Sequence, residues 1–453
     1  MKRVKSKFVC TECGYEAAGY LGKCPECNSW GTLVEEVVSD TLNNKKLSTI
    51  NDEKPLLIND IPINESVRVS TNISEFDRVL GGGLVQGSLV LLAGSPGIGK
   101  STLILQTSGQ LCNKNLKVLY VSAEESATQV KLRAERLKIN TDLLYIYPQT
   151  NIDSLDEQIN NIKPDIVVVD SIQAVYTNNL TSSAGSVGQV RECCNYLMRL
   201  AKTKNITVVV IGHVTKEGNI AGPKVLEHIV DAVIQFEGDK YKSYRILRAI
   251  KNRFGTTSEV GIFDMRSNGL VEISNPCELF LNENHIETPG SVIIAASEGS
   301  RPLLLEIQAL VGITPYPAPR RITNGVDTSR VLQILAVLEK RVGLNLSKQD
   351  VYVNVIGGMN ISEPAADLGI AVAIATCLND VTVNMHTVLI GEIGLSGEIR
   401  PVNDLEKRIY EAEKLGFTHA IVPKANNLNK SFEKIKISEV NRITDAIIKI
   451  TKE

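Results

Sequence analysis

Several features that would place the chain in another class of protein are absent. No run of roughly 18 or more uncharged apolar residues occurs, so we expect no membrane-spanning segment and no membrane partner. The formal net charge is only -2 over 453 residues, which excludes a polycation, so any contact with nucleic acid must come from local basic patches or an assembled channel. The basic start, residues 1–7, leads into cysteines instead of an apolar segment, which argues against a secretory signal.

Cysteine is scarce outside one cluster. Four of the nine cysteines lie within residues 10–27, and the other five are scattered with one adjacent pair. This distribution does not suit a disulfide scaffold and predicts a reducing compartment, so we expect a cytoplasmic protein. With 22% charged and 43% hydrophobic residues, a chain of this length is expected to be globular, with two or three domains.

The cysteine cluster has the spacing of a metal site. Two C-x-x-C pairs, Cys10 with Cys13 and Cys24 with Cys27, can each turn around one ion, and together they predict a tetrahedral Zn²⁺ site. Because the protein fills all four positions, we expect the zinc to be structural and to supply the folding energy of a small finger. A redox C-x-x-C is the competing interpretation, but no βαβ pattern surrounds the pairs.

A glycine-rich segment at residues 94–101 fits the P-loop pattern G-x-x-x-x-G-K-[ST]. The apolar run 88–93 before it predicts a buried strand, and residues 102–106 carry apolar side chains at helical spacing. Such a loop presents backbone N–H groups and a helix N-terminus to the phosphates of ATP. Lys100 is expected to reach the β- and γ-phosphates, and Ser101 to ligate Mg²⁺. The predicted nucleotide-binding residues are Gly94, Ser95, Pro96, Gly97, Ile98, Gly99, Lys100, Ser101 and Thr102.

Apolar strands alternate with helices after about residue 60, which predicts a parallel sheet covered on both faces. Ligands bind beyond the carboxyl ends of the strands in such a sheet. Asp170 ends the apolar run 166–170 in the form of a Walker B acid. We therefore expect Asp170 to hold Mg²⁺ together with Ser101.

Two further polar residues follow predicted strands. Glu124 comes after the strand at residues 117–122, which we expect beside the P-loop strand, and is the candidate to orient or deprotonate the attacking water. Glu125 is the competing choice. His213 ends another strand and could sense the γ-phosphate, or it could be an ordinary strand-end histidine with satisfied hydrogen bonds.

Two long polar loops, residues 177–186 and 215–224, are expected at the same edge of the sheet. Loops this long in a compact domain are usually functional or disordered. Arg191, Lys216 and Lys224 give them positive charge, which suits contacts with DNA phosphates.

A cationic motif, Lys251-Asn252-Arg253-Phe254-Gly255, follows the strand predicted at residues 244–248. Lys251 or Arg253 could reach the nucleotide of a neighbouring subunit and act as an arginine finger. A basic β-turn explains the same residues equally well, and the pattern leaves both interpretations open.

Four features occur together in this order: the four-cysteine finger, the P-loop, the segment 212–218 and the Lys251–Gly255 motif. With them the chain resembles the RadA (Sms) family of bacterial DNA-repair proteins over essentially its whole length. The resemblance implies a RecA-like ATPase core, related to the DnaB-type helicases and assembled as a hexameric ring. It implies an ATP hydrolase that depends on DNA and promotes branch migration in recombinational repair. The implied partners are single-stranded and branched DNA, with the RecA recombinase as a further candidate. The position of the catalytic glutamate in RecA-like cores favours Glu124 over Glu125.

The C-terminal third resembles the proteolytic domain of the Lon protease, with a second α/β unit opening at residues 301–311. In the matching segments Ala365 stands where Lon has its nucleophilic serine, and Glu406 stands where Lon has its lysine base. The resemblance therefore implies no peptidase activity, but ring assembly and a DNA-binding surface. Candidate DNA contacts are Arg301, Arg320, Arg321, Arg330, Lys340 and Arg341, although a solvated basic face explains any single one of them better.

The expected fold class is α/β in both large domains. The expected parts are a zinc finger at residues 1–34, a polar linker at 35–60, a RecA-like P-loop domain at 61–275 and a proteolytically inactive Lon-like domain at 276–453. The leading hypothesis is an ATP-driven motor on single-stranded DNA. The alternative is a nucleotide-gated DNA-binding scaffold, in which ATP only switches assembly. An ATP-dependent protease is a third class, which the replaced nucleophile and base disfavour.

Overall fold

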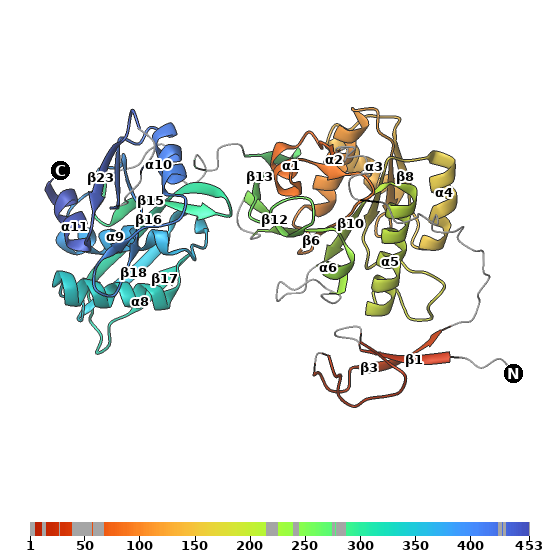
Figure 1. Cartoon of the computed structure of the whole chain (residues 1–453), viewed down its shortest axis with the longest axis horizontal. Helices are drawn as coiled ribbons and strands as arrows, with labels where there is room; N and C mark the ends of the chain where they lie inside the picture. Colours follow the sequence, from red (N-terminus) through yellow and green to blue (C-terminus); the bar gives the residue numbers. More distant parts are fainter. Residues whose placement is uncertain are drawn as a thin grey trace. The chain divides into compact units, whose positions relative to one another are not determined.

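The computed structural model describes residues 5–10, 15–26, 28–38, 57, 68–213, 225–238, 244–273, 277, 287–424, 428 and 432–452. The chain divides into two compact units, Met1–Ser274 and Asn275–Glu453. Figure 1 labels the elements of both units. In the described part of the chain, no helix has both the length and the hydropathy needed to cross a membrane.

The first unit begins with a small antiparallel sheet in the order β2-β1-β3. Its strands are β1 (Lys5–Cys10), β2 (Glu16–Ala17) and β3 (Leu33–Val38). Among the described residues, its buried side chains are Val9, Cys10, Cys24 and Leu33, of which the last three form one cluster. A core this small cannot stabilise a sheet without a further crosslink.

A nine-stranded sheet forms the body of the first unit, in the order β14-β13-β12-β11-β6-β10-β9-β7-β8. From β11 to β8 all neighbouring strands are parallel, whereas β12, β13 and β14 continue the sheet in antiparallel pairs. The strands are β6 (Leu89–Gly94), β7 (Val118–Ser122), β8 (Leu144–Tyr147), β9 (Ile166–Asp170), β10 (Thr207–His213), β11 (Ala232–Glu237), β12 (Tyr244–Asn252), β13 (Val260–Arg266) and β14 (Gly269–Glu272). A separate pair, β4 (Arg68–Val69) and β5 (Leu84–Val85), is antiparallel.

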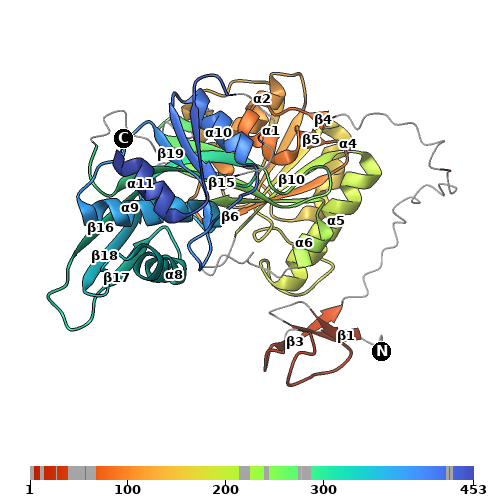
Figure 2. The same ribbon diagram turned by 60° about the vertical axis from the view of Figure 1, so that its left-hand side comes forward.

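Helices cover both faces of this sheet, as the sequence predicts. The helices on one face are α1 (Ser74–Leu80), α2 (Lys100–Cys112) and α3 (Ala127–Arg136). Those on the other face are α4 (Leu155–Ile162), α5 (Val187–Lys204) and α6 (Val225–Ile229), and the 3₁₀ turn η2 (Ile152–Ser154) leads into α4. Figure 2 shows α5 and α6 together on their side of the sheet. Because both faces are covered, every residue of β6, β7 and β9 is buried.

The strand order corrects one sequence-based expectation. The strand that precedes Glu124 does not lie beside the P-loop strand, because β10 and β9 separate β7 from β6. The neighbours of β6 are β10 and β11. A crossover of this kind leaves no local signal in the sequence, since each strand is equally apolar wherever it is placed.

The second unit is built on a seven-stranded sheet in the order β17-β18-β16-β15-β19-β22-β23. Its strands are β15 (Ser291–Glu298), β16 (Arg301–Ile313), β17 (Arg321–Asn324), β18 (Gln349–Val355), β19 (Thr387–Leu389), β22 (His419–Pro423) and β23 (Lys436–Val440). The unit thus has a strand, β15, before residues 301–311, where the sequence predicts that it opens. A hairpin of β20 (Glu392–Ile393) and β21 (Ile399–Arg400) stands apart from this sheet.

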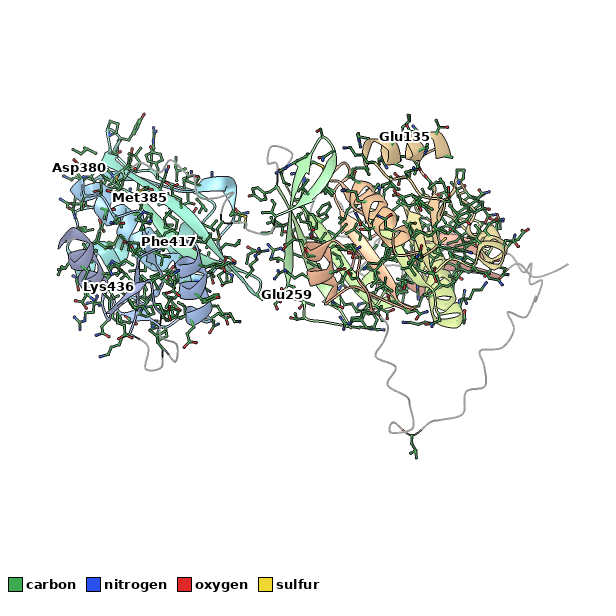
Figure 3. The ribbon with its side chains drawn as sticks, turned by 90° about the horizontal axis from the view of Figure 1, so that it is seen from above. Glu135, Glu259, Asp380, Met385, Phe417 and Lys436 are labelled. Atoms are coloured by element: carbon green, nitrogen blue, oxygen red, sulfur yellow. The ribbon has the colours of Figure 1, made fainter. Side chains whose placement is uncertain are left out.

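Its helices are α8 (Thr328–Val337), α9 (Asp367–Asn379), α10 (Leu405–Lys414) and α11 (Ile443–Lys452), with short helical turns η3 (Leu338–Val342), η4 (Ile356–Gly358) and η5 (Pro364–Ala366). Helix α9 is buried without interruption from Asp367 to Thr376, because it is apolar on all sides. Figure 3 adds the side chains of both units; Glu135, labelled on α3, belongs to the surface, where it pairs with Lys131 at 3.8 Å.

Candidate active site

The segment between β6 and α2 has the backbone that a phosphate loop requires. Gly97 and Gly99 have φ angles of 76° and 115°, which favour glycine. A Cβ atom at Gly99 would lie 2.5 Å from Met265 Cε, and one at Gly94 would lie 2.8 Å from the carbonyl oxygen of Phe236. Residues 95–97 are exposed to solvent, whereas Lys100 at the start of α2 is 4% exposed. The loop therefore offers open backbone N–H groups above a buried cation.

The Lys100 ammonium group is held by the loop itself. Its Nζ atom donates to the carbonyl oxygens of Gly94 at 2.8 Å and Ser95 at 2.9 Å, and lies 3.2 Å from His213 Nδ1. Burial lowers the pKa of Lys100 to about 8, although the carboxylates of Asp170 and Glu124 oppose the shift. A phosphate arriving at the loop would supply the negative charge that restores full protonation.

Asp170 occupies the carboxyl end of β9 and is 8% exposed. Tyr120 Oη donates to its Oδ2 atom at 2.6 Å, and the Ser101 hydroxyl is a further hydrogen-bond donor to it. Burial raises the pKa of Asp170, and these hydrogen bonds oppose the rise. Ser101 and Asp170 thus bring a hydroxyl and a carboxylate together, the hard oxygen ligands that suit Mg²⁺.

The two adjacent glutamates have different partners. Glu124 accepts a hydrogen bond from the Ser171 hydroxyl, and its Oε1 atom lies 3.2 Å from His213 Nε2. The hydrogen bond with His213 is the main reason that the pKa of Glu124 falls to about 2, with further contributions from Ser171 and Lys100. Glu125 instead forms an ion pair with Arg133 of α3 at 2.5 Å. Of the two glutamates, Glu124 is therefore the one placed beside His213 and Lys100, while Glu125 is held by Arg133.

His213 joins the two sides of this site. One ring nitrogen contacts the P-loop lysine and the other contacts Glu124. This geometry does not correspond to a histidine satisfied only by its own strand end. It allows His213 to respond when a γ-phosphate displaces either contact, as a sensor would.

Of the expected DNA-contacting residues in this unit, the structure places one. Arg191 lies on α5, and residues 177–186 form the connection from the β9 edge to that helix. The loop 215–224, with Lys216 and Lys224, lies outside the described residues. The loop at residues 177–186 follows the strand that ends in Asp170, so it belongs to the nucleotide edge of the sheet.

The cationic motif lies at the opposite edge. Lys251 Nζ donates to the carbonyl oxygens of Glu227 at 2.6 Å and Val230 at 2.8 Å. Arg253 Nη1 lies 3.2 Å from Asp231 Oδ1, and Asp231 is hydrogen-bonded to Leu89, the first residue of the P-loop strand. Because the P-loop follows the last residue of that strand, neither cation belongs to the phosphate edge of its own chain.

The end of the motif is fixed by close backbone packing. Asn252 donates through Nδ2 to the carbonyl oxygen of Val79 at 3.3 Å, and its Oδ1 atom accepts from the N–H of Phe254 at 2.9 Å. A Cβ atom at Gly255 would lie 3.1 Å from Gly81 Cα, and one at Gly81 would lie 3.2 Å from Gly255 Cα. The turn that carries Arg253 is therefore packed against the end of α1.

The second unit has no peptidase nucleophile at the matching positions. Ala365 is 2% exposed within η5, and Glu406 lies in the first turn of α10. Arg408, 3% exposed at its side chain, binds both carboxylate oxygens of Glu363 at 2.7 and 2.6 Å and donates to the carbonyl oxygen of Ala295 at 2.6 Å. The Arg408–Glu363 ion pair thus stabilises the segment of this chain that matches the serine-bearing segment of Lon.

The basic residues of the second unit are not equivalent. Arg321 donates to the carbonyl oxygens of Leu346 and Gln349, and Arg330 forms an ion pair with Asp367. Arg320 stacks on Tyr316, with 3.8 Å between Cζ and the ring centroid. Of the six candidate DNA contacts, Arg320, Lys340 and Arg341 are exposed, whereas Arg301, Arg321 and Arg330 are only partly exposed.

The small N-terminal sheet suits a metal site. Cys10 and Cys24, one from each C-x-x-C pair, are both fully buried in the same small core, which fits two thiolates converging on one ion. Cys13 and Cys27 lie outside the described residues.

Two side chains in the nucleotide site were not anticipated from the sequence. Tyr120 is a phenol between Leu119 and Val121 in strand β7, and it reaches Asp170 on the neighbouring strand. Ser171 follows the Walker B acid directly and contacts Glu124. The position of a polar side chain within an apolar run could have indicated a role for Tyr120. Nothing in the sequence around Ser171 indicates its contact with Glu124.

Comparison with known proteins follows the same division of the chain. Residues 8–35 match a rubredoxin metal binding domain, residues 61–219 an AAA domain, and residues 325–426 subunit ChlI of Mg-chelatase. The AAA match supports ATP hydrolysis, generally with Mg²⁺, and the ribbon match suggests Zn²⁺.

Relatives match the chain along nearly its full length. The DNA repair protein RadA of Bacillus subtilis (strain 168) is 51% identical over 94% of this chain and 94% of its own. RadA of Listeria monocytogenes serovar 1/2a is 50% identical over 98% of both chains, and RadA of Streptococcus pyogenes serotype M1 is 48% identical over 99% of this chain and 100% of its own. At this identity and coverage the conclusion is direct: the chain belongs to the RadA family of DNA repair proteins.

Proposed function

We propose that the chain is a DNA-dependent ATPase that moves along single-stranded DNA as a hexameric ring and thereby promotes branch migration of recombination intermediates. The observation that carries the proposal is the arrangement around Ser171. Its hydroxyl contacts Glu124, the candidate that activates water, and the polar loop 177–186 begins six residues further along. The residue that contacts the candidate catalytic glutamate and the loop expected to touch DNA therefore belong to one continuous segment, residues 171–186.

The cationic motif supports assembly of several copies. Lys251 and Arg253 lie at the edge of the sheet away from the P-loop, so they can complete a phosphate site only on another copy. Head-to-tail contacts that repeat this geometry close into rings or extend as filaments. A ring around single-stranded DNA would place the polar loops of all copies along one strand.

The direct test is the rate of ATP hydrolysis with and without single-stranded DNA, together with branch migration of a synthetic junction. We expect stimulation by DNA and junction movement in wild-type protein, and loss of both in Lys100→Ala, which removes the buried cation of the P-loop. A folded, oligomeric protein that hydrolyses ATP at the same rate with and without DNA would contradict the proposal.

A second candidate, the nucleotide-gated scaffold, has one observation in its favour. Lys251 and Arg253 already have partners within their own chain, which is what a purely structural motif would show. Under this alternative, Arg253→Ala would weaken oligomer assembly without an independent effect on hydrolysis. Light scattering and ATPase rates of the same samples, compared at equal oligomer content, separate the two.

A further inference from the structure

The loop at residues 177–186 is held by a single buried side chain. Gln189, in the first turn of α5, is 1% exposed. Its Oε1 atom accepts from the N–H of Thr177 at 3.0 Å. Its Nε2 atom lies 3.1 Å from the carbonyl oxygen of Thr177, 3.2 Å from that of Leu180 and 3.0 Å from that of Ser182. An amide group has two N–H bonds, so one of them is shared, and the first half of the loop is wrapped around this one side chain.

A second anchor holds the start of the same loop. Asp153 of η2 accepts from Thr177 Oγ1 at 2.7 Å and from the N–H of Asn178 at 2.9 Å. The preceding residue, Tyr176, donates its N–H to the carbonyl oxygen of Thr150 at 2.9 Å. The beginning of the loop is therefore fixed between α5 and the turn that leads into α4, two elements on one face of the sheet (Figure 1).

The side chains that this arrangement exposes are small and uncharged. Asn178, Asn179, Thr181 and Ser183 face solvent, while Thr177 is buried. Amide and hydroxyl groups of this kind contact the phosphates and sugars of DNA and do not read its sequence. Because they carry no charge, they release no counterions on binding.

We propose that Gln189 and Asp153 are positioning residues, which hold residues 177–182 in advance as a neutral contact surface for the backbone of single-stranded DNA. A loop of this length that was ordered only on binding would lose affinity to the conformational entropy of ordering. This inference rests on the proposed function and assigns the neutral part of its DNA contact to these two side chains.

The experiment uses two variants and two matched controls in the full chain. Gln189→Met removes the amide at similar size, and Asp153→Ala loosens the loop from a surface position that threatens folding less. Gln110→Met makes the same exchange on α2, away from the loop. Asp156→Ala removes an equal charge three residues beyond Asp153, where the acid pairs with Lys204 at 3.1 Å. Any general electrostatic effect of losing an acid is thus common to both aspartate variants.

Oligo(dT) is the probe. In both test variants we expect its half-saturating concentration for ATPase stimulation to rise about tenfold, with the rate in the absence of DNA unchanged. The dependence of log affinity on log salt should keep its wild-type slope, because neither variant removes a positively charged side chain that contacts a phosphate. Hydrogen exchange of a peptide covering residues 177–186 should become faster. Both controls should behave as wild type in all four measurements.

Faster exchange without a change in the half-saturating concentration would overturn the inference, because the ordered loop would then not contribute to DNA binding. An equal loss of the DNA-free rate in both test variants would also overturn it, because that is the result of a general structural defect. Wild-type protein without DNA stimulation would remove the proposed function together with this inference, whereas stimulated wild type with unaffected variants removes this inference alone.

Discussion

Mixing two inactive variants should restore ATP hydrolysis if the cationic motif acts on a neighbouring copy. β6 has six residues, so at about 3.3 Å per residue its two ends are about 17 Å apart. Arg253 contacts Asp231, which accepts a hydrogen bond from Leu89, the first residue of β6. The P-loop begins at the other end of the strand, at Gly94. An extended arginine side chain reaches only about 7 Å, so Arg253 cannot touch the phosphates of its own chain.

The expected recovery follows from counting interfaces. Lys100→Ala subunits lack a working P-loop but keep Arg253, and Arg253→Ala subunits have the reverse. In a random equal mixture, half of the sites have Lys100 and half of those meet a neighbour with Arg253, so about a quarter of the interfaces are complete. Because an arginine finger contributes about 10³–10⁵-fold to hydrolysis, each variant alone should be nearly inactive.

The assay is steady-state hydrolysis with DNA, measured on each variant alone and on mixtures that were dissociated and reassembled. Arg253 is 55% exposed at its side chain, and the buried Asp231 keeps Lys202 at 2.8 Å and the N–H of Leu89 when Arg253 is removed, so the fold should stay intact. Lys202→Ala, which removes the other cation on Asp231, is the control and should remain active. Mixtures no more active than their components would refute action between copies.

The remaining predictions concern single sites. Glu124→Gln should lower the hydrolysis rate about 10²–10⁴-fold with little change in ATP affinity, and Glu125→Gln much less, as measured by turnover and equilibrium binding; equal losses would contradict the assignment. Because the pKa of Lys100 is lowered to about 8, the free site loses its cation as pH rises through that value, so ATP affinity should be steady from pH 6 to 7.5 and then weaken, at most about tenfold per pH unit. Lys100→Arg, which stays charged, should show no such weakening. Cys24→Ser should abolish stoichiometric zinc in elemental analysis, and retained zinc would reject the four-cysteine site. Arg408→Met should destabilise the chain by about 3–5 kcal/mol in urea unfolding, because it leaves a carboxylate unpaired in a mostly buried pair.

The phosphate loop could be predicted from sequence because its geometry is local. Glycines at Gly97 and Gly99 adopt the positive φ angles that the spacing implies, and a buried strand and a helix flank them as expected. The parallel sheet with two covered faces followed for the same reason, since continuous apolar runs and helical periodicity are local patterns.

Contacts between distant segments could not be predicted in this way. The antiparallel strands β12 to β14 and the separation of β7 from β6 depend on which strands pair. The sequence of an apolar strand does not indicate which strand lies beside it. The residues alone leave Glu124 and Glu125 both open, the family resemblance favours Glu124, and only the folded chain shows that Glu125 pairs with Arg133. The roles assigned to Lys251 and Arg253 stay predictions, because they concern a second copy.

The packing of Gly255 on Gly81 has a consequence for the direction of Arg253. Gly81 ends helix α1 with a φ of 80° and is far from the cationic motif in sequence. Because it has no side chain, Gly255 and the turn that carries Arg253 can pack directly against its backbone. A methyl group on either glycine would lie 3.1–3.2 Å from the facing Cα atom, so the turn that carries Arg253 would have to shift slightly to accept it. If Arg253 acts on a neighbouring copy as proposed, its reach depends partly on the absence of a side chain at Gly81, at the end of a helix distant in sequence.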